Sequence, residues 1–145
     1  MKKKLMAVCV CLVLIFLAGC SMGENPYSSL TQMSKRDVES FAKEARETYL
    51  EQDWVKLSDM ISYPIQVGSD RNLKNKKEFI EYMKGRKAQK SALESMEKET
   101  CRDMFVNGDG ICMADGMLWL IDENFDGIEQ QGEPELRIYS INGIK

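Results

Sequence analysis

The segment DENFDGIEQQGE, residues 122 to 133, matches the spacing of a calcium-binding loop at every fixed position. The residues at positions 1, 3, 5 and 12 of that loop are Asp122, Asn124, Asp126 and Glu133. Gly127 stands at position 6, where such a loop bends sharply. Hard cations such as Ca²⁺ take oxygen ligands of this kind, including a late glutamate that binds with both oxygens. These four side chains are therefore candidate calcium ligands.

The neighbours of this loop favour a different interpretation. An EF-hand loop lies between two helices, whereas GMLWLI just before this loop has the composition of a strand. Pro134 follows Glu133 directly, where the exit helix would have to continue, and Glu129 occupies a position that is normally aliphatic. Between strands, the segment is a polar hairpin connection with Asp126 and Gly127 as its turn signal. We expect a polar loop, with a calcium loop of another kind as the alternative.

Histidine is absent from the chain. Its absence removes the usual general base, the Ser-His and Cys-His nucleophile pairs and most zinc sites. Cys101 and Cys112 flank an Asn-Gly-Asp-Gly hairpin signal. A turn centred on residues 108 and 109 would place Cys112 opposite Phe105, and the two sulfurs about four residues apart, beyond disulfide reach. We therefore expect two buried free thiols.

The N-terminus has the layout of an export signal. Three lysines precede an uncharged apolar run over residues 5–18. That run is shorter than the roughly 20 residues that a bilayer-spanning helix needs, although an uncleaved membrane anchor remains the alternative. LAGC, ending at Cys20, resembles the lipobox of bacterial lipoproteins. The resemblance implies a signal peptide over 1–19, a lipid on Cys20, a tether over 20–33, and anchoring on the extracytoplasmic face of the cell membrane.

The charge of the remaining chain restricts its partners. Without the lysines of the signal, 17 basic residues face 23 acidic ones, a net charge of −6. Such a balance argues against nucleic acid and against electrostatic binding to anionic lipid. One local exception is a basic cluster: Lys84, Arg86, Lys87 and Lys90. We expect a solvated face there, with an anion-binding patch as the alternative.

Hydrophobic periodicity predicts helices in the first part of the mature chain. Ser34, with Asp37 three residues later, forms the N-cap signal of a first amphipathic helix. Asp53 can cap a short second helix, and Asn75 with Glu78 opens a third. The charged stretch that follows, up to residue 99, is compatible with a helix or with a mobile connection.

Extended segments follow a different pattern. SYPIQV, residues 62–67, has the composition of a strand, which Pro64 restricts to an edge or a first position. Three further antiparallel strands are predicted over TCRDMFV, GICMADGMLWLID and ELRIYSIN. Gly116 inside the second of them indicates a bulge. The expected fold class is α+β, with N-terminal helices packed on a curved antiparallel sheet.

Four segments carry a family resemblance: LSDMISYPIQV, NKKEFIEYM, MFVNGDGICMADGMLW and IYSING. In this order they resemble small secreted proteins of the nuclear transport factor 2-like superfamily, which belongs with the cystatin-like group. The resemblance implies a cone-shaped domain over 34–145, with a pocket between the concave sheet and the helices. It also implies that two copies of the chain could form a homodimer through the sheet. The motifs are structural rather than catalytic, so they imply a fold and leave the function open.

Five aromatic residues are candidates to line that pocket: Trp54, Tyr63, Phe79, Tyr82 and Trp119. The alternative is that they fill the core, as apolar residues at helical or strand spacing usually do. An isomerase-type enzyme would need a carboxylate base and a hydroxyl donor. Asp103 and Asp115 are candidate bases and Tyr63 and Tyr82 are candidate donors, although a hairpin would place the two carboxylates on opposite faces of the sheet unless a bulge at Gly116 intervenes.

The sequence thus favours a membrane-anchored, extracytoplasmic and non-catalytic module without a cofactor. Its expected partners are a small ligand, a peptide or an envelope protein. A small isomerase and a calcium-binding module are the two alternatives.

Overall fold

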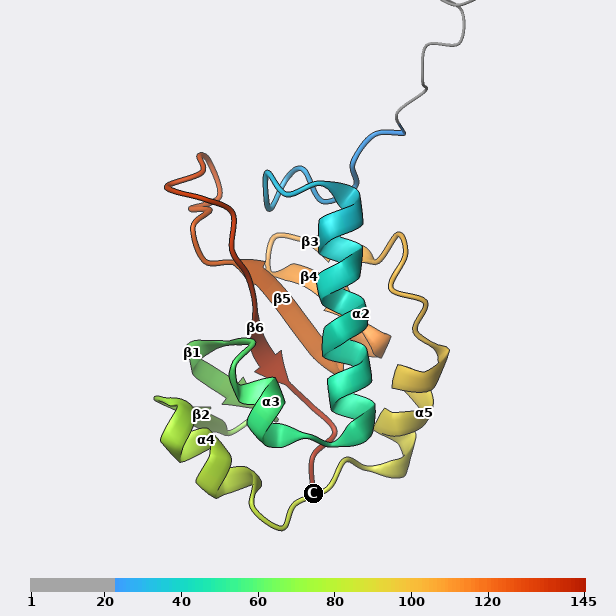
Figure 1. Cartoon of the computed structure of the whole chain (residues 1–145), viewed down its shortest axis with the longest axis vertical. Coiled ribbons are helices and arrows are strands. Elements are labelled where there is room, and N and C mark those ends of the chain that lie inside the picture. The colour runs from blue at the N-terminus through green and yellow to red at the C-terminus, as the bar shows by residue number, and fades with distance from the viewer. Residues whose placement is uncertain (1–22) are drawn as a thin grey trace, which may run out of the picture.

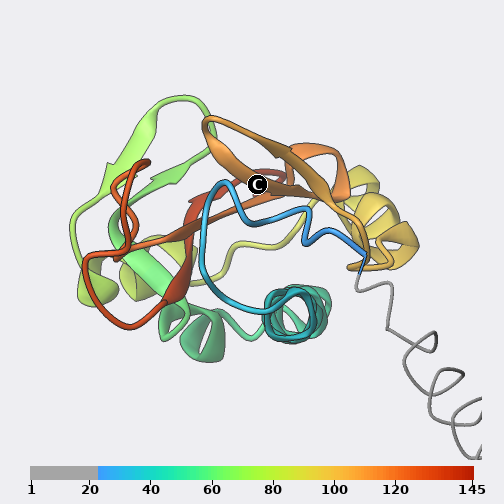
Figure 2. The ribbon, with the colours of Figure 1, turned by 90° about the horizontal axis from the view of Figure 1, so that it is seen from above.

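The computed structural model describes residues 23–145, so the predicted signal peptide and Cys20 lie outside the described residues. The helices are α2 (Lys35–Glu51), α3 (Trp54–Ser58), α4 (Lys76–Met83) and α5 (Lys90–Lys98). The strands are β1 (Ile61–Val67), β2 (Arg71–Leu73), β3 (Phe105–Asn107), β4 (Gly110–Met113), β5 (Leu118–Asp122) and β6 (Leu136–Ile141). Helices α2, α3 and α4 lie on one face of the sheet (Figures 1 and 2). The fold class is α+β, as predicted.

Three helix starts confirm the predicted N-caps. Ser34, Asp53 and Asn75 precede α2, α3 and α4, and each side chain accepts a hydrogen bond from a backbone N–H in the first turn. The three distances are 3.2, 2.9 and 3.0 Å. These bonds satisfy donors that a helix start otherwise leaves free. The charged stretch over residues 84–99 is helical only in its second part, as α5, while residues 84–89 form a non-helical connection.

The sheet is mixed, which corrects the prediction of an antiparallel sheet. Its strand order is β2-β1-β6-β5-β4-β3, and β1 runs parallel to β6 while the other pairs are antiparallel. Strand β1 is internal, so the predicted edge or first position of Pro64 is also wrong. Pro64 lies where the register with β6 shifts between Ile61 and Gln66, and pairing with β2 begins only at Ile65. An irregularity of this kind accommodates a residue without a backbone N–H.

The continuous strand predicted over residues 110–122 is a hairpin in the structure. Strands β4 and β5 pair with each other, with Met113 opposite Leu118. Residues 114–116 form the turn, with positive φ values of 50°, 56° and 89°. A tight turn therefore takes the place of the predicted bulge at Gly116, and the C-terminal part of the sheet has four strands instead of three.

Both described cysteines are free, as predicted. Phe105 pairs with Cys112 across the β3–β4 hairpin, which is the register expected from the turn. Cys101 is buried and Cys112 is half-buried. Burial raises the pKa of Cys101 to about 11, so this thiol stays protonated near neutral pH.

The N-terminal segment of the described chain packs on the domain. Tyr27 is fully buried, and its hydroxyl oxygen accepts a hydrogen bond from the backbone N–H of Met104 at 3.2 Å. Thr31 is also fully buried and donates to the Asp122 carboxylate at 2.6 Å. The packed chain therefore begins ahead of Ser34, inside the predicted tether. No helix of residues 23–145 is long and apolar enough to cross a bilayer.

Candidate binding groove

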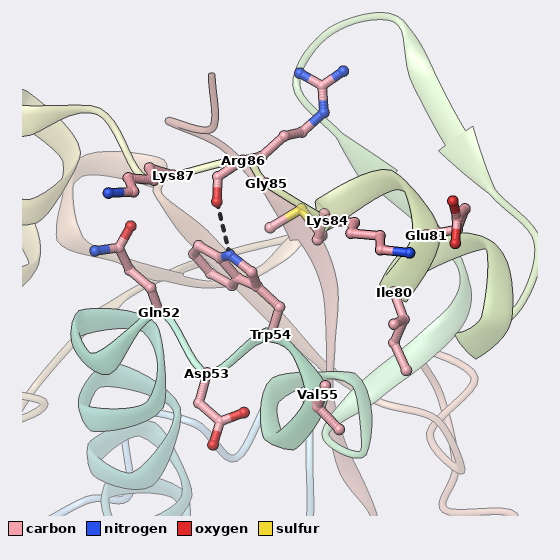
Figure 3. A pocket seen from close by; sticks show the side chains of 11 residues that line it. Gln52, Asp53, Trp54, Val55, Ile80, Glu81, Lys84, Gly85, Arg86 and Lys87 are labelled. Carbon is pink, nitrogen blue, oxygen red and sulfur yellow. Dashed lines mark hydrogen bonds between the residues drawn. The ribbon is translucent and has the colours of Figure 1, made fainter.

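A surface groove of about 520 Å³ lies between α3 and α4 and is open to solvent (Figure 3). One wall consists of Gln52, Asp53, Trp54 and Val55. The other wall consists of Ile80, Glu81, Met83, Lys84, Gly85, Arg86 and Lys87. We call this feature the α3–α4 groove.

The sharp junction of α2 and α3 places Trp54 in the groove wall. Gln52 adopts a left-handed conformation with φ 55° and ends α2, and Asp53 then caps α3, so that Trp54 is the first residue of α3. The indole meets the Tyr49 ring edge-on, with centroids 5.7 Å apart. Its N–H donates to the backbone carbonyl of Arg86 at 3.1 Å. Both contacts hold the indole in one orientation across the groove.

Both walls of the groove carry apolar side chains. Val55 is 57% exposed, Ile80 is half-buried and Met83 is buried. Figure 3 shows Trp54 and Val55 on one side and Ile80 on the other. Exposed apolar side chains that lie singly need no explanation, but apolar side chains gathered in a concavity with a polar rim are typical of a binding site.

The groove lining is basic at residues 84–87 and the basic residues continue to Lys90, so we call residues 84–90 the basic stretch. Its charged members are Lys84, Arg86, Lys87 and Lys90. The Arg86 guanidinium lies 4.2 Å from the centre of the Tyr82 ring and donates from Nε to the Tyr82 carbonyl at 2.9 Å. Within residues 23–145, neither Lys84 nor Lys87 forms an ion pair. These two ammonium groups are therefore available to a ligand.

The C-terminal segment fixes the backbone of the basic stretch. Lys87 and Lys145 exchange backbone hydrogen bonds at 3.2 and 3.0 Å, and the N–H of Gln89 donates to the carbonyl of Gly143 at 2.7 Å. Gly143 has φ 74°, and a Cβ at this position would overlap the side chain of Ala92. Glycine thus allows the close approach that holds the rim in place.

The structure places the predicted aromatic residues in separate environments. Trp54 lines the groove, and Tyr82 lies beside it under the Arg86 guanidinium. Phe79 is fully buried in the core, and Trp119 alternates with the buried Leu118 and Leu120, so it faces the other side of the sheet. The five side chains do not share one pocket.

Tyr63 lies in β1, and its side chain is half-buried. Its hydroxyl donates to the carbonyl of Ser58 at 3.2 Å. Burial, with a smaller contribution from the negative charge of Asp59, raises the pKa of Tyr63 to about 12. The hydroxyl therefore serves a backbone contact and does not face the groove.

The two carboxylates considered for an isomerase are exposed. Asp103 forms an ion pair with Lys35 at the start of α2. Asp115 lies in the β4–β5 turn and accepts a hydrogen bond from Ser95 at 3.4 Å. Neither residue lines the α3–α4 groove.

The first candidate calcium ligand, Asp122, is occupied by the chain itself. It is only 5% exposed and accepts hydrogen bonds from the Thr31 hydroxyl and from the backbone N–H groups of Asn124 and Glu135. Burial alone would raise the pKa of Asp122, but these hydrogen bonds outweigh it and lower the pKa. The carboxylate is a structural acceptor that joins the N-terminal segment to the sheet.

The other candidate calcium ligands also make local contacts. Asp126 accepts from the backbone N–H groups of Glu129 at 2.8 Å and Ile128 at 2.9 Å, and these bonds lower its pKa. The amide of Asn124 donates to the carbonyl of Glu133 at 2.7 Å, while the Glu133 carboxylate is exposed. The loop connects β5 to β6, so the predicted strands on both sides are present. Over residues 23–145, acidic and thiol side chains form no cluster of metal-ligand geometry.

No family model matches the chain, and neither a curated protein nor a solved structure matches it.

Two apolar groove residues, Val55 and Ile80, were not predicted as part of a site, and they lie 25 positions apart in the sequence. The sequence did offer Trp54 as a pocket candidate and Lys84, Arg86 and Lys87 as members of a basic cluster, but it contained no signal that these segments meet in one groove.

Proposed function

We propose that this protein is a lipid-anchored extracytoplasmic binding module that holds a peptide segment of an envelope partner in the α3–α4 groove. The observation that carries the proposal is the groove itself. It combines a fixed Trp54, an exposed Val55 and two rim lysines, Lys84 and Lys87, that have no ion-pair partner among residues 23–145.

The open shape of the groove favours a peptide over a small enclosed ligand. Small-molecule sites usually bury most of the ligand in an enclosed cleft. The α3–α4 groove is open to solvent and runs between two helices. A peptide can place one apolar side chain between such walls while its backbone stays at the surface. Aromatic residues such as Trp54 commonly contribute most to the affinity of such contacts.

The position of the groove agrees with a lipid on Cys20. The described chain begins near the first turn of α2, whereas α3 and α4 lie beside its last turns (Figure 1). An anchor that precedes the domain would therefore direct the groove away from the membrane. The lipobox-like LAGC supports this part of the proposal. Replacement of Cys20 by serine should move the protein from the membrane fraction to the soluble fraction, and an unchanged distribution would overturn the anchor.

Peptide binding is tested with the mature protein in detergent and an array of short peptides that cover a wide range of compositions. We expect some peptides to bind the wild type and to lose at least tenfold in affinity with Trp54→Ala, about 1.4 kcal/mol. Trp119→Phe is the matched control, because Trp119 lies on the other side of the sheet.

A second variant separates binding from folding. Val55 is 57% exposed, so Val55→Asp should leave the melting temperature nearly unchanged and still weaken the peptides. The proposal fails if no peptide binds, or if bound peptides are indifferent to both Trp54→Ala and Val55→Asp.

A further inference from the structure

We infer that the α3–α4 groove selects acidic peptides, with an apolar side chain against Trp54 and carboxylates on Lys84 and Lys87. The inference rests on the proposed function, because it names the class of peptide that the same groove would take.

The charge of the basic stretch contrasts with the rest of the molecule. The chain from Cys20 onward carries a net charge of −6. Residues 84–90 contain four basic residues and no acidic one. The local potential over this rim is therefore opposite in sign to the net charge, and it would attract a negatively charged partner.

The charged groups around the groove differ in how far the fold already uses them. Arg86 stacks on Tyr82, and Lys90 lies 3.6 Å from the Glu94 carboxylate. The ammonium groups of Lys84 and Lys87 have no acidic partner among residues 23–145.

Two acidic residues, Asp53 and Glu81, also line the groove, and their negative charges do not fully offset the positive charges there. The Asp53 carboxylate accepts from the backbone N–H of Lys56 at 2.9 Å and so serves as the N-cap of α3. Glu81 is exposed and forms no ion pair with the described residues. The carboxylates of Asp53 and Glu81 remain charged, and against the three basic lining residues Lys84, Arg86 and Lys87 they leave a net charge of +1 on the groove lining.

The two lysines extend from a rim that is already ordered. The N–H of Ala88 donates to the Gln52 side chain at 2.9 Å, and Lys87 pairs with Lys145 through the backbone. The carbonyl of Arg86 accepts from Trp54. A ligand would thus have to order lysine side chains but not the loop, which lowers the entropic cost of binding.

The bilayer is not the source of the negative charge. The groove lies at the end of α2 opposite the entry of the chain from Cys20 (Figure 1). Lipid headgroups next to the anchor would face the other end of the domain. A peptide of a neighbouring envelope protein can reach the groove from the solvent side.

The test uses three nine-residue peptides with the same central Phe-Leu pair and with flanks of glutamate, lysine or serine. Trp119→Phe leaves Trp54 as the sole tryptophan of the protein, so its fluorescence reports binding at the groove. We expect the glutamate peptide to bind at least tenfold more tightly than the lysine peptide. Raising the salt concentration should reduce this difference, since salt screens exposed charges.

Charge reversal at the rim provides the second arm. The double variant Lys84→Glu, Lys87→Glu should invert the preference between the acidic and basic peptides. The matched control is Lys43→Glu, Lys98→Glu, which changes the net charge equally at exposed lysines outside the groove. This control should keep the preference for the acidic peptide.

The possible outcomes separate this inference from the proposed function. Equal binding of the acidic and serine peptides, or tighter binding of the basic one, overturns acidic selection while the groove remains a peptide site. The same applies if both double variants change the preference equally. A Trp54 signal that responds to none of the three peptides, nor to any peptide of the array, overturns both.

Discussion

Two charged segments stand out in the sequence, and the structure uses them in opposite ways. In the acidic loop over 122–133, the carboxylates of Asp122 and Asp126 accept hydrogen bonds from the chain itself. In the basic stretch over 84–90, the backbone is held by neighbouring segments, but the ammonium groups of Lys84 and Lys87 have no acidic partner among the described residues.

The two segments differ in what their charged groups contact. A charged group with internal partners stabilises the fold, and its loss leaves buried donors without acceptors. A charged group that extends from an ordered backbone beside an apolar groove contributes little to stability and remains available for recognition. The two segments should therefore respond differently to mutation, pH and metal.

The largest effect is expected from Asp122→Ala. The change leaves the Thr31 hydroxyl and the N–H groups of Asn124 and Glu135 without their acceptor. We expect a loss of about 3 kcal/mol in the free energy of unfolding, since each unsatisfied buried donor costs roughly 1–3 kcal/mol. Urea denaturation measures it. Asp126→Ala, in the exposed part of the same loop, should cost much less than Asp122→Ala, and equal losses would contradict the distinction.

The stabilising contribution of the Asp122 carboxylate should be lost at acidic pH. The pKa of Asp122 in the folded protein lies below the ordinary value of 3.8. Its contribution to stability is therefore complete above that value and is lost as the pH falls through the lower, folded-state pKa. The melting temperature of the wild type should fall more steeply between pH 5 and pH 2 than that of Asp122→Asn. Parallel curves would show that other groups govern the acid response.

Charge reversal in the basic stretch should change the stability of the fold very little. Because the side chains of Lys84 and Lys87 make no ion pair with the described residues, the double change to glutamate should alter the free energy of unfolding by less than about 0.5 kcal/mol. Denaturation of this variant beside Asp122→Ala compares the two segments directly. A loss of several kcal/mol would mean that the rim lysines stabilise the fold.

The smallest effect is expected from calcium. Since Asp122 and Asp126 already accept hydrogen bonds from the chain, millimolar calcium should leave the melting temperature unchanged. Magnesium at the same concentration controls for ionic strength. A rise specific to calcium that Asp126→Ala abolishes would restore the loop as a metal site.

Local signals in the sequence predicted structure well. The caps at Ser34, Asp53 and Asn75 depend on side chains that bond three residues away, and the β3–β4 register depends on one turn. The parallel pairing of β1 with β6 joins segments about 75 residues apart, which periodicity does not encode. The β4–β5 turn was hidden because Ala114 and Asp115 adopt positive φ, which is uncommon for residues other than glycine.

The site was predictable only in part for the same reason. Trp54 was among the candidates and lines the groove. Phe79 points from α4 into the core, and Trp119 faces the other side of the sheet from β5. Val55 and Ile80 become neighbours only when α3 packs against α4. A groove between two short helices thus depends on packing, whereas a cap depends on the residues beside it.

The length of α2 determines how far the α3–α4 groove lies from the end of the domain where the chain enters. Its 17 residues extend about 25 Å along the helix axis, from the entry of the chain to the junction that carries Trp54. With a lipid on Cys20, the residues before Asn25 can add at most roughly 18 Å. The groove would then lie about 25 to 45 Å from the bilayer by the same lengths. A partner would have to present its peptide within that layer of the envelope.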